Sequence, residues 1–236
     1  MTFLRSLGIA AWLVCATASA APQTGDYAAM DVGGWLKISP GSGQSLKFRI
    51  DVLGSNASMC DVEGAIQGSQ ARVEAVGQSC VIDFKDIPDG LEVSTTTTPS
   101  ACRVFCGNRA IFEGQYIRSP PACTPDSQRR ARAGFLALYR KQSYAQAIQA
   151  LQGIHESCAR FTSFEMSVRD ANDLAVALFH VGDMAGCRRV LVPVLSELTD
   201  ARLQEMKGGA PTDYDIFSKI AASARFNDGK CQPGRN

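Results

Sequence analysis

The spacing of the apolar residues changes once along this chain, near Pro120-Pro121, and this change most constrains the fold. Before it, apolar and polar residues alternate, as in 46–52, which is the period of a half-buried strand. After it, apolar residues recur at helical intervals. Consecutive prolines cannot donate to a β-ladder and favour an extended linker. The sequence therefore predicts an α+β protein with a β domain at 26–119 and a helical domain at 122–236.

Six or seven short strands are predicted in the first half, with turn residues between them. The clearest are 35–38, 46–52, 60–66, 71–76, 80–84 and 91–95. Their spacing of roughly ten residues is typical of an antiparallel β-barrel or sandwich. The side chains expected in its core are Leu46, Phe48, Ile50, Val62, Ile66, Ile82, Phe84, Phe105 and Phe112.

The segment Cys102–Tyr116 is expected to form the last strands of this domain and the hinge to the helical half. It holds two cysteines, two glycines, three aromatic residues and two arginines within fifteen residues. Gly107 and Gly114 are typical of a bulge or a tight turn. Arg103 and Arg109 would then lie on a rigid β-scaffold, suited either to binding a partner's carboxylate or to surface salt bridges.

The second half is predicted to be an all-α domain of helical hairpins. Thr124 is a candidate N-cap, with Pro125 at the first helical position. A second helix is expected from Tyr144 to about Cys158, and further helices at Pro193–Met206 and Asp213–Phe226.

Residues 137–151 and 177–191 form an internal repeat, forty residues apart. Alanine, leucine, an aromatic residue and a turn recur in register, and Gly182-Asp183 supplies the second turn. The pattern resembles the helix-turn-helix unit of tetratricopeptide repeats, whose usual period is about thirty-four residues. A plain helical-hairpin bundle is the alternative, and the sequence leaves both open.

The first twenty residues have the pattern of a secretory signal peptide. Arg5 precedes an apolar run at 7–16, and Ala18–Ala20 is a small-residue cleavage site. Cleavage after Ala20 leaves 216 of the 236 residues and changes the formal net charge from +1 to zero. The run is too short to span a membrane, and a lipid anchor at Cys15 would need a small residue before it. A neutral chain argues against nucleic acid or an anionic membrane as the main partner.

Eight cysteines remain after this cleavage, and an even number in an exported chain indicates disulfide bonds. A metal site or free thiols are the alternatives, but no pair has Cys-x-x-Cys spacing. Four cysteines precede the proline pair and four follow it, so each domain is expected to close its own bridges, with the pairing left open. They are Cys60, Cys80, Cys102, Cys106, Cys123, Cys158, Cys187 and Cys231.

No group of residues predicts catalysis, so the chain is not expected to be an enzyme. His180 and Cys187 are close in sequence, but a disulfide is the more plausible role for Cys187. Arg129, Arg130 and Arg132 form the only basic cluster, which is expected to be a solvated helix face.

Two pairs of carboxylates could in principle act as general acid and base. Asp61 and Glu63 are expected on the solvent face of a strand, and Asp170 and Asp173 at the start of a helix, where the helix dipole favours acids. Neither pair is distinguished from ordinary surface chemistry.

A family resemblance rests on Gly54-Ser-Asn-Ala-Ser-Met-Cys60, Gly64, Cys80-Val-Ile, then Cys102-x-x-x-Cys-Gly-x-Arg-Ala and Gly114-x-Tyr116. Over about 35–118 the chain resembles the β domain of exported proteobacterial proteins named after LprI-type lysozyme inhibitors. The name of those proteins comes from a separate, cysteine-rich helical domain, and the helical half here departs from that pattern.

These observations lead to the hypothesis of a periplasmic or secreted binding protein. The first version is an inhibitor or immunity-type protein that engages a cell-wall hydrolase, such as a lysozyme-like enzyme or an amidase. Arg103, Asn108 and Arg109 would contact the acidic cleft of that enzyme. The alternative is a periplasmic adaptor that binds a partner protein through its helical repeats. No cofactor, metal, nucleic-acid partner or membrane insertion is expected.

Overall fold

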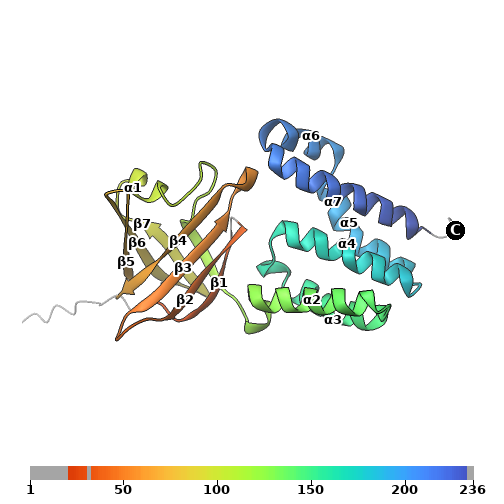
Figure 1. Ribbon diagram of the computed structural model, residues 1–236, viewed down its shortest axis with the longest axis horizontal. Helices are drawn as coiled ribbons and strands as arrows, with labels where there is room; N and C mark the ends of the chain where they lie inside the picture. The colour runs from red at the N-terminus through yellow and green to blue at the C-terminus, as the bar shows by residue number, and fades with distance from the viewer. Residues whose placement is uncertain (1–20, 31–32, 233–236) are drawn as a thin grey trace, which may run out of the picture.

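The computed structural model describes residues 21–30 and 33–232 of the 236-residue chain. Figure 1 shows a β-barrel on one side and a group of helices on the other, joined by one connection after the last strand. A β domain followed by a helical domain is therefore confirmed. The predicted signal sequence, including Cys15, lies outside the described residues.

Eight antiparallel strands close into a barrel in which each strand pairs with its neighbours in sequence. Strand β1 completes the barrel by pairing with β8, so that Tyr27 lies opposite Arg118. Strand β1 was not predicted from the sequence, because its five residues are too few to show a clear alternation. The strands are β1 (Gly25–Ala29), β2 (Gly33–Pro40), β3 (Leu46–Leu53), β4 (Met59–Gln67), β5 (Gln70–Ala75), β6 (Gln78–Ile87), β7 (Gly90–Thr95) and β8 (Gly114–Arg118).

Alternate side chains of the strands fill the barrel. In β3, Phe48, Ile50 and Val52 are buried while the residues between them are exposed. The rings of Phe48 and Phe84 meet edge to face, with centroids 5.1 Å apart. All the core residues predicted from the sequence belong to this cluster, with Leu46 and Phe105 only partly buried.

Between β7 and β8 the chain forms a short helix, α1 (Pro99–Arg103), and then an irregular segment, 104–113, which we call the capping loop. The prediction that Cys102–Tyr116 is made of strands is wrong except for its last three residues, which lie in β8. Disulfides hold the loop against the barrel wall, and this constraint leaves no periodic signal in the sequence. The loop also approaches Gly54 closely, since a Cβ there would lie 2.0 Å from the carbonyl oxygen of Arg109.

Each domain closes two disulfides of its own, as the distribution of the cysteines predicted. The pairs are Cys60–Cys106, Cys80–Cys102, Cys123–Cys158 and Cys187–Cys231.

Within the described residues, six α-helices form the second domain, and Figure 1 shows α4 between α2 and α7. The hydroxyl of Thr124 accepts the Ser127 N–H at 3.3 Å, which confirms the predicted N-cap of α2. Tight turns with positive φ at Gln142 and Gly182 join α2 to α3 and α4 to α5. The helices are α2 (Pro125–Arg140), α3 (Tyr144–Ser157), α4 (Phe164–His180), α5 (Met184–Glu197), α6 (Asp200–Gly209) and α7 (Pro211–Lys230).

The predicted helix Pro193–Met206 is wrong. Pro193 lies inside α5, and the chain breaks after Leu198. Thr199 then starts α6, with its hydroxyl accepting the Arg202 N–H at 3.2 Å. Proline is most favourable at the start of a helix, so its position inside α5 runs against the usual preference. The predicted helix Asp213–Phe226 is confirmed as part of α7.

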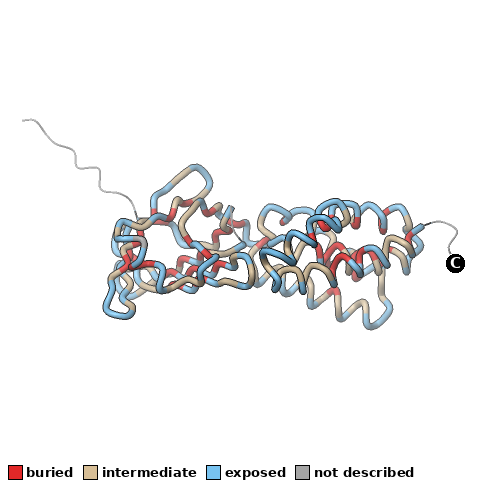
Figure 2. The backbone as a smooth tube through the Cα atoms, turned by 90° about the horizontal axis from the view of Figure 1, so that it is seen from above, coloured by how far each residue is buried: buried red, intermediate tan, exposed pale blue. Residues whose placement is uncertain are grey.

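The two domains have separate apolar cores. Figure 2 shows buried segments in both halves of the molecule. The helical core contains Leu151, Leu174 and Leu191, and it shares no residue with the barrel core. Each domain is therefore stabilised mainly by its own interior.

Candidate functional site: a groove between α4 and α7

A half-buried ionic cluster joins α2 to α4. Arg132 on α2 contacts Asp170, and its Nη2 lies 2.7 Å from Asp173 Oδ2. Arg132 is 23% exposed and Asp170 only 8%. Arg132 is therefore not part of a solvated helix face, and the two aspartates lie well inside α4 rather than at its start. Arg129 and Arg130 are exposed, as predicted. The predictions for Arg132 and for the two aspartates were wrong because each helix was considered without its neighbour.

Burial raises the pKa of Asp170 and Asp173, and Arg132 opposes this rise in both. Asp170 also raises the pKa of Asp173 through charge repulsion. Asp173 Oδ2 is buried, and its close contact among the described residues is the ion pair with Arg132. One guanidinium is thus shared between two poorly solvated acids.

A groove of about 400 Å³ opens beside this cluster, between α4 and α7. Arg132, Arg169 and Asp173 line one side of it, and Asp215 and Lys219 line the other. A second hollow of about 510 Å³ continues it along the same two helices, sharing Asp173. Together they form a trough along the seam of α4 and α7, which we call the α4–α7 groove.

The floor of the groove is held by an amide. The Asn172 Nδ2 donates to the carbonyl oxygens of Val168, at 3.1 Å, and Ile220, at 3.5 Å. The Asn172 Oδ1 accepts from Asn227 Nδ2 at 3.1 Å. The bonds to Ile220 and Asn227 fasten α4 to α7, so the groove has a preformed shape.

Charges of both signs are available in the groove. Arg169 is paired with Glu165 at 2.8 Å, and Arg132 with the two aspartates. Lys219 and Asp215, one turn apart on α7, form no ion pair within the described part of the chain. A ligand in this groove would therefore meet one unpaired cation and one unpaired anion.

The three side chains predicted to bind a partner lie elsewhere, on α1 and the capping loop. Arg103 donates to the carbonyl oxygens of Ala110, at 3.4 Å, and Asn108, at 3.3 Å. Arg109 donates to the carbonyl oxygen of Gly209 in the helical domain. The exposed Asn108 side chain forms no hydrogen bond with the residues described here. Both arginines were expected on β-strands, and neither lies on one. Each instead donates hydrogen bonds to backbone carbonyl oxygens of the protein itself.

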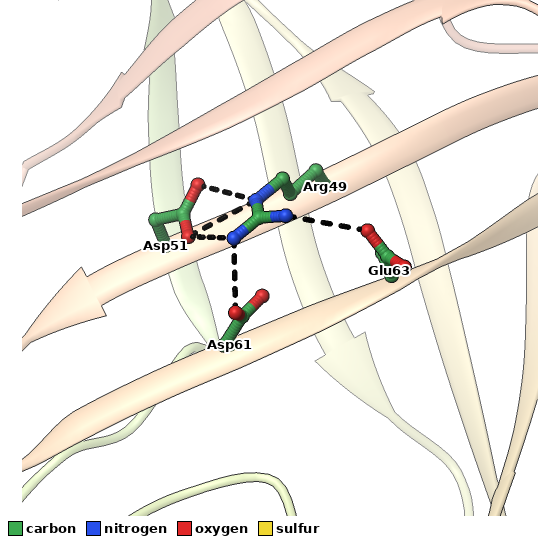
Figure 3. A network of polar contacts seen from close by, with 4 residues as sticks. All are labelled: Arg49, Asp51, Asp61 and Glu63. Carbon is green, nitrogen blue, oxygen red and sulfur yellow. Dashed lines mark hydrogen bonds and ion pairs between the residues drawn. The ribbon is translucent and has the colours of Figure 1, made fainter.

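The acids Asp61 and Glu63 surround an arginine on the outer wall of the barrel (Figure 3). Arg49 contacts Asp51 at 3.0 Å, Asp61 at 2.9 Å and Glu63 at 3.4 Å. The hydrogen bond with Asp51 and the three negative charges raise the pKa of Arg49. The predicted solvent-face position of Asp61 and Glu63 is confirmed, and both share one cation.

The histidine and cysteine considered for catalysis do not form a pair. Cys187 is bonded to Cys231. His180 ends α4 and stacks on Tyr144, with ring centroids 4.3 Å apart. Within the described ranges, no group of three histidine, cysteine or acidic residues could hold a metal ion, and no helix has the length and apolarity to cross a membrane.

Comparisons with known proteins do not extend this picture. No protein family, curated protein or solved structure matches the chain.

The sequence analysis missed Arg169, Asn172, Asp215 and Lys219. They belong to α4 and α7, which touch although the whole segment 181–210 separates them in the chain. A polar stripe beside the apolar face of each helix is the sequence signal for these groove residues. The stripe indicates a groove only when it is known which helices pack against each other.

Proposed function

We propose that this chain is an exported binding protein that holds an extended segment of a protein partner in the α4–α7 groove. The observation that carries the proposal is the groove itself: a preformed trough with unpaired charges of both signs. Four disulfides are compatible with an oxidising compartment outside the cytoplasm. The proposal places the protein in the periplasm or outside the cell, as an adaptor rather than an enzyme.

The arrangement of the helices supports this function. Two helix pairs forty residues apart, followed by α6 and α7, support the interpretation of this domain as a stacked, tetratricopeptide-like array. Such arrays bind polypeptides along helices of one face. Here α2, α4 and α7 contribute that face.

A peptide library displayed on phage and selected against the oxidised full-length protein tests the proposal. Lys219→Glu reverses the unpaired cation, while Lys141→Glu makes the same change at an exposed position in the turn after α2. Fluorescence anisotropy should show that selected peptides lose at least tenfold in affinity for the first variant and bind the second like the wild type. Equal affinity for all three proteins would refute the groove as the binding site.

A second candidate function is inhibition of a cell-wall hydrolase through the capping loop. The loop is held by the disulfide of Cys106 and by Arg103, and it exposes the apolar side chains of Val104 and Ile111. A rigid loop loses little conformational entropy on binding, which suits an inhibitor.

The test of the second candidate is inhibition of a panel of lysozymes and amidases by the mature oxidised protein. Ile111→Asp should abolish inhibition, whereas Val192→Asp, an equally polar change at an exposed position on α5, should not. Arg109 is a poor probe because it also contacts the helical domain. Inhibition that survives Ile111→Asp would exclude the loop, and no inhibition of any hydrolase would exclude the function.

A further inference from the structure

The first turn of α7 lacks a capping residue from its own domain. Its N-cap position is Ala210, whose side chain has no hydrogen-bond acceptor, and Pro211 follows it. The Tyr214 N–H reaches the Ala210 carbonyl oxygen at 3.0 Å, but the Thr212 N–H has no such partner within the helix.

The barrel supplies the missing cap. Asn56, in the connection between β3 and β4, accepts the Thr212 N–H on its Oδ1 at 2.9 Å. In return, the carboxylate of Asp213 accepts the backbone N–H of Asn56, with both oxygens at 3.0 Å. This is the reciprocal arrangement of a capping box, with its two halves on different domains.

The backbone of Asn56 is shaped for this contact. Its φ and ψ are 57° and 38°, in the left-handed region that asparagine adopts more readily than most residues. A second bond, from Arg109 to the Gly209 carbonyl oxygen, completes the end of α6 just before α7 begins. The barrel thus supplies hydrogen-bond partners for a carbonyl oxygen at the end of α6 and for an N–H at the start of α7.

These bonds are polar, and the apolar cores of the two domains remain separate. A small polar contact can open and close more easily than a packed apolar one. The helix that it holds is also a wall of the α4–α7 groove, since Thr212, Asp215 and Lys219 line it on successive turns of α7.

We propose that the barrel regulates the α4–α7 groove through the capping box that Asn56 and Asp213 share across the two domains. While the barrel is docked, α7 is held against α4 and the groove keeps its shape. When the barrel separates, the first turns of α7 lose their cap and the groove wall loosens. A ligand that requires the ordered wall would therefore favour the docked state, and a partner that binds the barrel near Asn56 would weaken binding in the groove. This inference rests on the proposed function of the groove.

Hydrogen exchange of the oxidised full-length protein, measured by mass spectrometry without any ligand, tests the device. Asn56→Gly removes the cap and keeps the left-handed backbone, and Ser55→Ala is the matched control at an exposed neighbour without a side-chain hydrogen bond in the described structure. In Asn56→Gly, amides of α7 from Thr212 to Lys219 should exchange about fivefold faster, as expected for loss of one cap. In the same variant, the amides of α2 and of the barrel strands should exchange at wild-type rates. In Ser55→Ala, every amide should exchange at the wild-type rate.

Wild-type exchange throughout α7 in Asn56→Gly would overturn the proposal. Faster exchange confined to Thr212 and Asp213 would also overturn it, because fraying of one turn does not reach the groove wall. Asp213→Ala breaks the same box from the helical side and should give the same pattern, which guards against a misfolded barrel variant. Since no ligand is used, the result does not depend on whether the groove binds peptides.

Discussion

Replacing Arg132 by leucine should destabilise the helical domain by about 3 kcal/mol at neutral pH. Removing one partner of a fully buried ion pair costs about 3–5 kcal/mol. Asp170, with 8% of its side chain exposed, is close to that limit, whereas Asp173, at 29%, keeps part of its hydration and adds less. The expected loss therefore lies near the lower end of that range.

The stability that the helical domain loses in the Arg132→Leu variant should become smaller at acidic pH. Burial raises the pKa of both aspartates in the folded state, so they bind protons more tightly there than in the unfolded chain. Their contribution to stability is complete below the unfolded value of about 3.9 and is lost as the pH rises through the folded pKa. Without Arg132 this dependence becomes steeper, so the variant should approach the wild type near pH 4.

Urea unfolding followed by circular dichroism at 222 nm measures this effect. Trp35 is the sole tryptophan after the predicted cleavage and lies in β2, so its fluorescence reports the barrel as an internal control. The triple variant Arg132→Leu, Asp170→Asn, Asp173→Asn should recover most of the stability, because it leaves no unpaired buried charge. A loss that is the same at pH 4 and pH 7, or that persists in the triple variant, would show that Arg132 acts through packing instead.

Three further predictions concern stability, with the same two probes. Phe84→Ala should lower the unfolding free energy of the barrel by about 3–5 kcal/mol. The unfolding of the helical domain should be unchanged, because the two cores are separate. A loss of stability in both domains would contradict this. Replacing Cys187 and Cys231 by alanine opens a link across 44 residues and should cost the helical domain about 4 kcal/mol, whereas a change below 1 kcal/mol would refute it. Gly54→Ala should cost the barrel about 1–3 kcal/mol, since its Cβ would meet the carbonyl of Arg109; wild-type stability would show that the capping loop yields freely.

The β domain could be predicted from the sequence because its strands interact with their neighbours in sequence. Alternation in segments such as 46–52 specifies which side chains point inward, and a meander needs no long-range information to place them. Closure of the barrel could not be derived, since it depends on β1 pairing with β8 across the whole domain. The capping loop could not be derived either, because disulfides rather than periodicity determine its path.

The candidate site was harder to predict for the same physical reason. Arg132 is a surface arginine on an isolated α2, and it becomes half-buried only when α4 packs beside it. Asn56 belongs to the sequence pattern that carries the family resemblance, but its role depends on Asp213, which lies 157 residues away. Local sequence patterns thus specify the helices and strands. The groove forms only when α4 packs against α7, and the capping box only when the barrel contacts α7.

The pairing of β1 with β8 has a consequence for biosynthesis. A chain that emerges N-terminus first presents β1 long before Arg118, the partner of Tyr27, is available. Until then the growing sheet has two open edges, which can pair with other chains. Cys102 of α1 and Cys106 of the capping loop emerge before β8, so both disulfides of this domain can form while the barrel is still open. The segment that leads into the last strand is then already bonded to β4 and β6, which shortens the time during which nascent chains can aggregate.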